Sequence, residues 1–171
     1  MAVTIDADPV SPTFNCYVSL ADAIIIVDGM LNTAAWDAAT TADKNRALLM
    51  ATSLIDTHVD WYGLVTETDQ LLEWPRSTVQ IKGRPLGTYF PSDEIPDFLK
   101  EATSDFASRL LVEDRTVDQE TGLSGIKVSN ISVQFNRRDR KDVMPDSVKI
   151  RIKPYGTIIN ATSSTVRLVR A

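Results

Sequence analysis

Few residues in this chain could do acid–base, nucleophilic or metal chemistry. The only histidine is His58 and the only cysteine is Cys16. A histidine-based hydrolase needs its imidazole within hydrogen-bond reach of a nucleophile and an orienting acid. His58 instead ends a predicted helix, where the dipole favours a cation, and this position indicates a capping or surface role. A single cysteine forms no disulfide and no cysteine metal cluster within one chain. We therefore expect no catalytic, cofactor or metal site, and no enzyme activity.

Two charged clusters could bind a partner. Asp93, Glu94 and Asp97 lie at a predicted helix start, where carboxylates complement the positive end of the helix dipole, and we favour this explanation over a cation site. The run 137–142 holds four basic and two acidic residues. It has no interleaved aromatic residue to stack on bases, so a solvated loop or a salt-bridge strip between subunits is favoured over nucleic-acid binding. The candidate contact residues in this run are Arg137, Arg138, Arg140 and Lys141.

Trp74, Pro75 and Arg76 form a second candidate contact loop, for subunits or for a tail protein. Tryptophan and arginine dominate the binding energy of protein interfaces, which supports this interpretation. The alternative is that the tryptophan fixes its own loop from the inside. We favour this second interpretation. All three tryptophans of the chain have a simple explanation as anchors of loops and of the core.

The whole chain is acidic, with 23 Asp and Glu against 18 Lys and Arg in 171 residues. A protein that binds nucleic acid tightly usually presents a basic surface, because neutralised phosphates release counterions. The acidic balance suits solubility, or a surface along which DNA passes without sticking. No apolar run approaches the roughly 20 residues that span a bilayer. The length suits one domain, and the lone cysteine fits a reducing cytosol.

Helical periodicity predicts a mainly α fold, a small bundle of about three to four helices. Ser19 with Asp22 begins a helix over 19–31, and a similar Thr-x-x-Asp pair begins one over 41–58. A third runs over 95–113 from Pro96, with Asp105 outside its apolar face, and a single turn over 34–38 presents Trp36. The apolar faces comprise Leu20, Ala23, Ile24 and Val27; Ala47, Leu48, Ala51, Leu54 and Ile55; Leu99, Ala102, Phe106 and Leu110.

The remaining segments lack a helical period. Residues 1–16 are predicted to be an extended, poorly packed arm with a short edge strand at 3–5. Residues 59–92 form a long loop, and such loops often serve an interface. Strands are predicted over 126–135 with a bulge at 129–130, and 145–155 fits either a strand or a short helix. The residues expected to anchor the long loop are Trp61, Trp74, Tyr89 and Phe90, and a small hairpin is expected from Val79 to Leu86.

An ordered series of short signatures runs along the chain. It comprises Tyr17-Val18-Ser19-Leu20-Ala21-Asp22-Ala23, Ala34-Ala35-Trp36-Asp37, Ala51-Thr52-Ser53-Leu54-Ile55-Asp56, Trp61-Tyr62-Gly63, Glu73-Trp74-Pro75-Arg76, Ile95-Pro96-Asp97-Phe98-Leu99-Lys100-Glu101-Ala102 and Pro154-Tyr155-Gly156. In this order and spacing the series resembles the head–tail connector (adaptor) proteins of tailed bacteriophages. Members of that group often carry the label "DnaT-like single-stranded-DNA-binding".

The resemblance implies a structural virion protein. Such adaptors form a homo-oligomeric ring, commonly twelvefold, beneath the portal; they join it to a tail or neck protein and line the channel for packaged double-stranded DNA, which passes without specific binding. It implies a helical domain over 1–156, with a helix at 145–155. The 59–92 loop and the 126–135 strands would contact neighbouring subunits or tail proteins. A C-terminal arm over 157–171 would bind the portal through Val166, Arg167, Leu168, Val169 and Arg170. The protein would be assembled in the host cytoplasm, reside in the virion neck, and involve no membrane.

A replication accessory protein that binds single-stranded DNA is the alternative that the label suggests. Such a protein needs a basic groove that carries aromatic residues. In the sequence, only residues 137–141 offer the basic part of such a groove.

Overall fold

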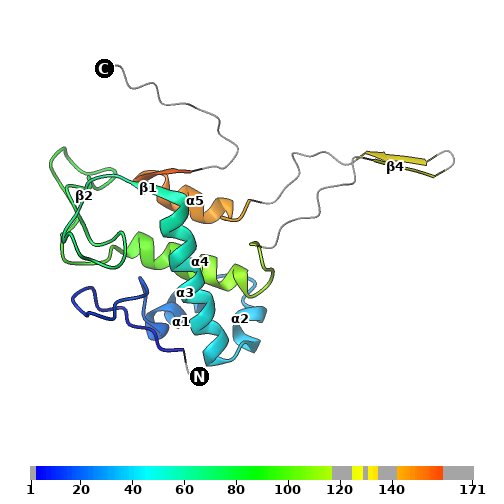
Figure 1. Cartoon of the computed structure of the whole chain (residues 1–171), viewed down its shortest axis with the longest axis horizontal. Coiled ribbons are helices and arrows are strands. Elements are labelled where there is room, and N and C mark those ends of the chain that lie inside the picture. Colours follow the sequence, from blue (N-terminus) through cyan, green and yellow to red (C-terminus); the bar gives the residue numbers. More distant parts are fainter. Residues whose placement is uncertain (1–2, 117–124, 129–130, 135–141, 160–171) are drawn as a thin grey trace, which may run out of the picture.

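The computed structural model describes residues 3–116, 125–128, 131–134 and 142–159. Within these residues it contains five helices and three pairs of short strands (Figure 1). The elements are α1 (Leu20–Asp28), α2 (Ala34–Ala38), α3 (Thr41–His58), β1 (Val59–Trp61), β2 (Leu64–Val65), β3 (Arg76–Ser77), α4 (Asp97–Leu110), β4 (Gly125–Val128), β5 (Ile131–Gln134), α5 (Asp146–Ile152) and β6 (Gly156–Ile158). The predicted mainly α class is confirmed.

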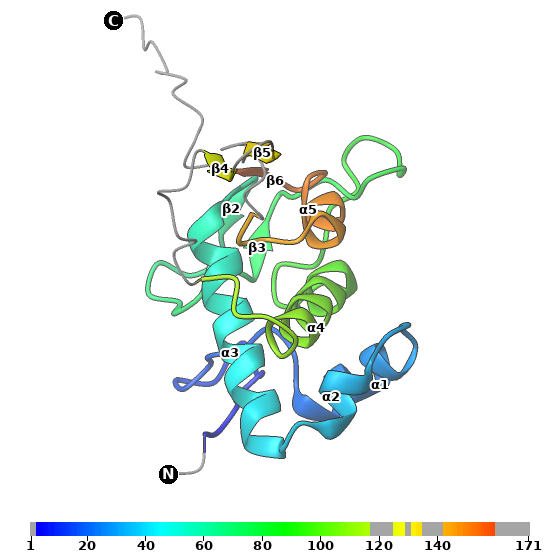
Figure 2. The same cartoon turned by 90° about the vertical axis from the view of Figure 1, so that its right-hand side faces the viewer.

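Helix α4 is the centre of the body and packs against α3, α5 and α1 (Figure 2). Its neighbours cover most of its circumference, so polar residues are buried along with apolar ones. The prediction that Asp105 lies outside is wrong, since that residue is only 6% exposed. Arg109 Nε and Ser147 Oγ each donate to its carboxylate at 2.7 Å, which compensates the cost of burying the charge.

The helix starts follow the predicted capping residues. Ser19 Oγ accepts a hydrogen bond from the Asp22 amide at 3.1 Å, and Thr40 Oγ1 accepts one from the Asp43 amide at 3.2 Å. Each hydroxyl satisfies one of the amides that a helix start leaves without a partner. Helix α3 has the predicted bounds, whereas α1 ends at Asp28, earlier than predicted, with Gly29 as its C-cap.

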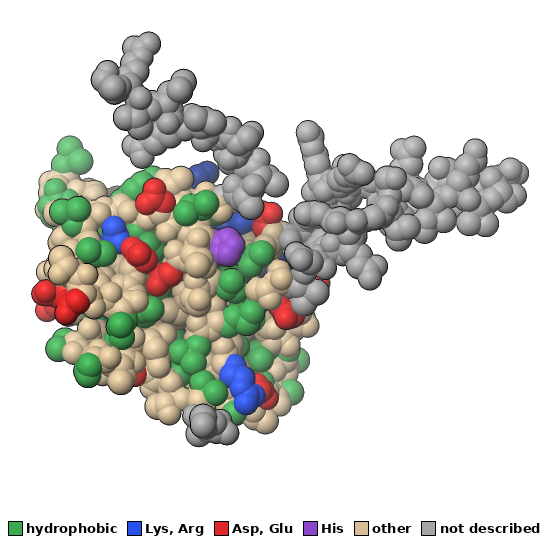
Figure 3. Space-filling model, in the orientation of Figure 1, with side chains coloured by type: hydrophobic (Ala, Val, Ile, Leu, Met, Phe, Trp, Pro, Cys, Tyr) green, Lys and Arg blue, Asp and Glu red, His purple; other side chains and the backbone are tan. Residues whose placement is uncertain are grey.

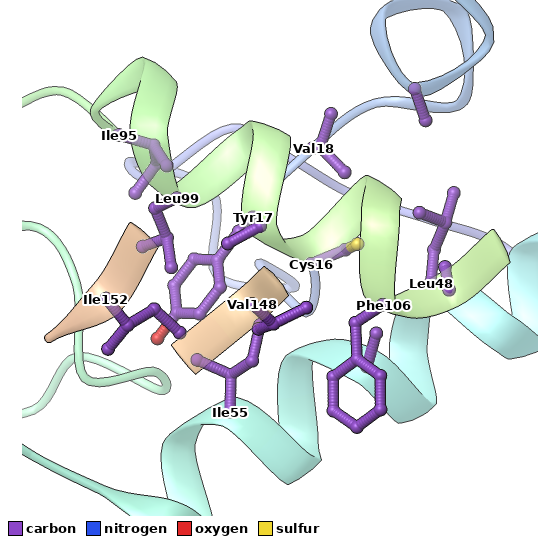
Figure 4. Close-up of a cluster of buried hydrophobic side chains, with 14 of the residues drawn as sticks. Cys16, Tyr17, Val18, Leu48, Ile55, Ile95, Leu99, Phe106, Val148 and Ile152 are labelled. Atoms are coloured by element: carbon purple, nitrogen blue, oxygen red, sulfur yellow. The ribbon is translucent and has the colours of Figure 1, made fainter. Parts of the chain in front are cut away.

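The hydrophobic core lies among α3, α4, α5 and the segment that precedes α1 (Figure 4). No strand forms at 3–5, contrary to prediction, and residues 3–13 are exposed or half-buried. The predicted poor packing is wrong at Phe14 and Cys16, which are buried. A turn explains the packing, because the Asp6 carboxylate accepts from the Ser11 and Thr13 hydroxyls and folds the segment back. Trp36 of α2 was expected to be presented, but it is buried in the same core.

Within the segment 145–155, for which either a strand or a helix was predicted, Asp146–Ile152 form the helix α5, whose Val148 and Ile152 are buried. Strand β6 follows and pairs antiparallel with β1, with Trp61 opposite Gly156 and Val59 opposite Ile158. The Ile159 amide then donates to the His58 carbonyl at 2.8 Å. Residues 157–159 therefore belong to the body, and the domain boundary predicted at 156 is too early.

Several predicted features lie outside the described residues. These are the bulge at 129–130, the basic run at 137–141 with Arg137, Arg138, Arg140 and Lys141, and the arm residues 166–170. The predicted strands on either side of the bulge are confirmed as β4 and β5, which pair with each other.

Candidate interaction surface

Residues 59–92, which we call the lobe, contain β1, β2 and β3 and no helix. Their far end is a hairpin: the Phe90 amide donates to the Val79 carbonyl at 3.1 Å, and the Ile81 amide donates to the Thr88 carbonyl at 2.9 Å. Gln80 and Tyr89 pair between these bonds. The hairpin predicted from Val79 is confirmed, but it returns to Phe90, further than the expected end at Leu86.

Aromatic rings attach the lobe to the body. Trp74 lies edge-on to Trp61 and to Phe98 of α4, with both pairs of ring centroids 5.6 Å apart. Phe90 packs on the same rings, and Phe98 stacks on Tyr155 at 4.1 Å. Edge-to-face pairs of this kind add to the free energy of burying the rings. The predicted anchors Trp61, Trp74 and Phe90 are confirmed.

Arg76 holds the lobe together from within and is only 8% exposed. Its Nε donates to the Tyr62 carbonyl and its Nη2 to the Gly63 carbonyl, both at 3.0 Å, and its Nη1 forms a 2.7 Å ion pair with Glu73. The planar guanidinium suits this task because its donors point in fixed directions. It ties the turn before β2 to the segment before β3.

The candidate contact residues Trp74, Pro75 and Arg76 are all buried. Little of these three side chains is accessible to a partner, which agrees with the favoured interpretation that the tryptophan fixes its own loop from the inside. They are buried because a segment without a helix draws its interior from a few rings, Trp74 among them, and from the Arg76 guanidinium. Whether the lobe contacts another protein stays a prediction, and other residues would make that contact.

Large apolar residues on the outside of the lobe form what we call the apolar lobe surface. Its members are Tyr62, Leu64, Val65 and Leu71, of which Leu64 is 67% exposed. Figure 3 shows hydrophobic side chains over the part of the molecule that Figure 1 labels β2. Residues 59–75 also contain four acidic residues, all exposed, and no basic one. Clustered exposed apolar residues mark interaction sites in soluble proteins.

The sequence carried a weak signal for this surface. Leu64, Val65 and Leu71 are large apolar residues within a segment that has neither a helical nor a strand period. Periodicity tells inside from outside only where an element is regular. The exposure of these residues could therefore be seen only in the structure.

The tip of the hairpin forms a second, smaller feature, a basic one. Lys82, Arg84 and Tyr89 are exposed there, next to Leu86, which is 97% exposed. Within the described ranges, neither cation forms an ion pair, and Tyr89 is no anchor of the loop, contrary to prediction. The paired cations in those ranges are Arg46, Arg76, Arg109, Lys149 and Arg151. Sequence reasoning missed this patch because Lys82-Gly83-Arg84-Pro85 was interpreted only as a turn.

Asp56 joins the lobe to the body. Its carboxylate accepts from the Tyr17 hydroxyl and, at 3.3 Å, from the Glu73 amide. Burial raises the pKa of Asp56 to about 6, against the opposing effect of these hydrogen bonds. Burial, followed by the charge of Asp56, raises the pKa of Tyr17. The pair fixes three segments to one another, and the carboxyl group can gain or lose a proton near neutral pH.

The other residues considered for chemistry have structural partners. His58 Nδ1 lies 2.8 Å from the Leu54 carbonyl at the end of α3, in agreement with the predicted capping role. Burial raises the pKa of the Cys16 thiol, which disfavours the reactive thiolate. The acidic trio Asp93, Glu94 and Asp97 borders an open hollow of about 370 Å³ beside the start of α4. In the part of the chain that the structure describes, no three His, Cys, Asp or Glu residues gather in a way that could hold a metal ion.

Fold and surface together define a small, mainly α-helical domain with an anchored lobe that presents apolar and acidic residues. None of the described helices has the length and apolarity needed to cross a bilayer. The chain belongs to the family described as "Putative DnaT-like ssDNA binding protein", whose family model matches residues 1–171. No curated protein and no solved structure matches the chain. The DnaT-like part of the sequence resemblance is confirmed, and the connector part stays a prediction.

Proposed function

We propose that the protein is a structural subunit that assembles with copies of itself, as the head–tail connector of a tailed bacteriophage. The observation that carries the proposal is the apolar lobe surface, together with its acidic surroundings. An isolated monomer gains nothing from holding Leu64 and Leu71 in water, whereas a subunit buries such residues against a neighbour. The ordered sequence signatures supply the connector assignment.

In this role the protein forms a ring beneath the portal, of about twelve subunits by resemblance to connectors. A tail or neck protein binds its other side, and packaged double-stranded DNA passes through the channel. The acidic surface residues keep that DNA from sticking. Residues 160–171 bind the portal through Val166, Arg167, Leu168, Val169 and Arg170. The ring acts without catalysis, without a cofactor and without a membrane; it is assembled in the host cytoplasm and resides in the virion neck.

Electron microscopy of particles made without the protein tests this proposal. Full heads that lack tails are the expected result, and restoring the gene should restore the tails. A second sample, which carries the gene truncated after residue 159, should give a folded protein that no longer joins the heads. Particles with normal necks in the absence of the protein would overturn the proposal.

Binding of single-stranded DNA is a second candidate function. It is favoured by the description of the family, which names this activity, and by the hairpin tip. There, Lys82 and Arg84, which form no ion pair with a residue that the structure describes, occur close in sequence to the exposed Tyr89. Cations on the backbone and an aromatic ring under a base are the two parts of sequence-independent recognition of single strands.

Fluorescence anisotropy with a labelled oligothymidine at two salt concentrations tests the second candidate. It predicts micromolar affinity that falls steeply with salt, because bound phosphates release counterions. The variant with Lys82→Ala, Arg84→Ala and Tyr89→Ala should lose binding, whereas Lys153→Ala, which removes an exposed cation elsewhere, should keep it. Equal affinity in both variants, or no binding by the unchanged protein, would reject DNA binding at the hairpin tip.

A further inference from the structure

An open hollow of about 510 Å³ lies at the end of α4, between the turn that links α1 to α2 and the start of α5. Three arginines line it: Arg109 in the last turn of α4, Arg115 beyond that helix, and Arg151 of α5. Leu31 and Val112, which are 90% and 68% exposed, line it as well. We call it the arginine hollow.

The three guanidinium groups keep donors that the described part of the chain does not use. Arg109 Nε donates to the Asp105 carboxylate, and Arg151 Nη1 donates to a glutamate of α4. Arg115 Nη1 donates to a backbone carbonyl at 3.2 Å, while its Nε is buried and has no partner among the described residues. A guanidinium has five N–H donors, so each group can still bind carboxylate oxygens of a partner. The acids among the described lining residues are Asp105 and Glu113, so the lining is net positive.

The apolar lobe surface has the complementary chemistry. Its exposed apolar side chains match Leu31 and Val112, and residues 59–75 add four exposed acidic residues and no basic one. Three of these acids form no ion pair with a residue that the structure describes: Asp60, Glu67 and Asp69. Apolar side chains that meet at the centre of a contact supply affinity, and opposite charges around them fix its orientation.

The two surfaces lie at opposite ends of α4. Phe98, in the first turn of that helix, packs on Trp74 of the lobe, whereas Arg109 is in the last turn. From the rise per residue, the 14 residues of α4 span about 21 Å. Figure 1 shows the same separation, with β2 of the lobe and α2 on opposite sides of the body. The lobe of one copy can therefore reach an arginine hollow only in another copy.

We propose that the apolar lobe surface of one copy of the chain docks in the arginine hollow of a second copy. Carboxylates of the lobe pair with the remaining guanidinium donors, while Leu64 and its apolar neighbours cover Leu31 and Val112. Two different patches meet, so each bound copy still offers one free lobe or one free hollow, and the contact closes into a ring where the rotation allows it. This inference rests on the proposed oligomeric function and names the two surfaces that would build the oligomer.

Complementation between two defective variants of the full chain tests the contact. Leu64→Asp places a charge in the lobe surface, and Leu31→Asp places one at the hollow. Sedimentation velocity should show oligomers of three or more copies for the unchanged protein, and each variant alone should associate about tenfold more weakly or worse. An equimolar mixture should form dimers and nothing larger, because each pair has only one intact lobe and one intact hollow that can meet.

Leu86→Asp is the matched control, since Leu86 is 97% exposed and belongs to neither surface. It should assemble like the unchanged protein, and urea unfolding should show that the body is intact in every variant. If either defective variant alone still forms the full oligomer, or if the mixture stays monomeric, this inference is overturned and the oligomeric function still stands. An unchanged protein that is monomeric at every concentration would overturn both.

Arg115→Gln tests the charged part of the contact. It should weaken association by about fivefold and make its decrease with salt less steep, because one screened attraction between the copies is lost. Lys153→Gln, which removes an exposed cation outside the hollow, should leave both unchanged. Equal association of the two variants at low salt would take the guanidinium groups out of the contact and overturn the inference.

Discussion

The helical body and the lobe have interiors of different composition. In the body, residues such as Leu99 and Phe106 of α4 are fully buried between neighbouring helices. In the lobe, a few rings and the Arg76 guanidinium form the interior, while residues such as Leu64 remain in water. The body therefore holds the larger apolar core, whereas the lobe is held by a few rings and one guanidinium. Substitutions in the two regions should therefore have separable effects.

The largest expected effect is on the body. Phe106→Ala should lower the free energy of unfolding by about 3–5 kcal/mol, because it removes a fully buried ring and leaves a cavity between α4 and its neighbours. Urea unfolding followed by far-ultraviolet circular dichroism measures the change. Leu64→Ala on the lobe is the control and should change it by less than about 0.5 kcal/mol. A large loss in the control would contradict the division between body and lobe.

Arg76 offers a way to break the lobe while sparing the body. Arg76→Ala removes the donors for the Tyr62 and Gly63 carbonyls and leaves the ion pair with Glu73 unmade. An acceptor left without a donor costs about 1–3 kcal/mol when it is buried; these two are only partly buried, so we expect a loss of about 2 kcal/mol. Hydrogen exchange should speed up over 59–92 and remain slow in α3 and α4.

The control for this substitution is Arg46→Ala. Arg46 forms an ion pair with Asp43 on the exposed face of α3, where solvent screens the interaction, and no measurable change in exchange or stability is expected. Arg76→Lys should restore little, since an ammonium group cannot reproduce the fixed directions of the guanidinium donors. Uniform loss of protection across the chain in Arg76→Ala would show that lobe and body unfold as one unit.

Two glycines in the lobe lie in different surroundings, one in its packed part and one at its exposed tip. Gly63 has φ +74° and Gly83 has φ +77°, so an alanine is strained at both. A Cβ at Gly63 would lie 2.3 Å from the Ser77 carbonyl oxygen, whereas none of the described atoms lies within 4 Å of one at Gly83. Gly63→Ala should therefore cost about 2 kcal/mol more than Gly83→Ala, which should cost about 1 kcal/mol. Equal thermal midpoints for the two variants would contradict the close packing of β2 on β3.

The regular elements of the body could be predicted because their signals are local. The hydroxyl at Thr40, the acid at Asp43 and the apolar face from Ala47 to Ile55 all specify α3. Burial of a second helix face depends on elements far away in the sequence. Asp105 lies outside the apolar face of its own helix, and it is covered because α5, which carries Ser147, packs over it. The N-terminal segment was missed for the same reason, since the buried Cys16 lies against Thr52 of α3, with 3.4 Å between Sγ and Oγ1.

The candidate surface could be predicted only as a segment. The absence of period over 59–92 correctly indicated a loop without a helix, and Trp74-Pro75-Arg76 correctly indicated its most constrained part. That constraint arises where Trp74 packs on Phe98 of α4 and, within the lobe, where Arg76 donates to the Gly63 carbonyl. Which residues then remain outside depends on this packing, so Leu64, Val65 and Leu71 could be recognised as exposed only in the structure.

Asp56 lies where the two regions meet, and its ionisation should couple them to pH. Its hydrogen-bond partners are Tyr17 of the body and the amide of Glu73 in the lobe, and the charge of Glu73 adds to the effect of burial. Burial raises its pKa from 3.8 to about 6, so the folded chain binds more protons than the unfolded chain between these values. The contribution of Asp56 to the free energy of unfolding is therefore fully present below about pH 4 and is lost as the pH rises through 6.

Asp56→Asn should remove this dependence because the amide stays neutral at every pH. Urea unfolding at pH 4, 5, 6 and 7 should show the unchanged protein losing on the order of 2 kcal/mol across this window relative to the variant. The pKa values of Asp6, Asp43 and Asp114 are lowered in the folded chain. These groups therefore change the free energy of unfolding below about pH 4, and they destabilise the fold as the pH falls, so they do not mask the effect of Asp56. Hydrogen exchange over 59–92 should also become faster as the pH rises in the unchanged protein, and not in Asp56→Asn. That result would show that ionisation of Asp56 weakens the attachment of the lobe to the body. Parallel stability curves for the two proteins would show that the carboxyl group titrates as it does in water.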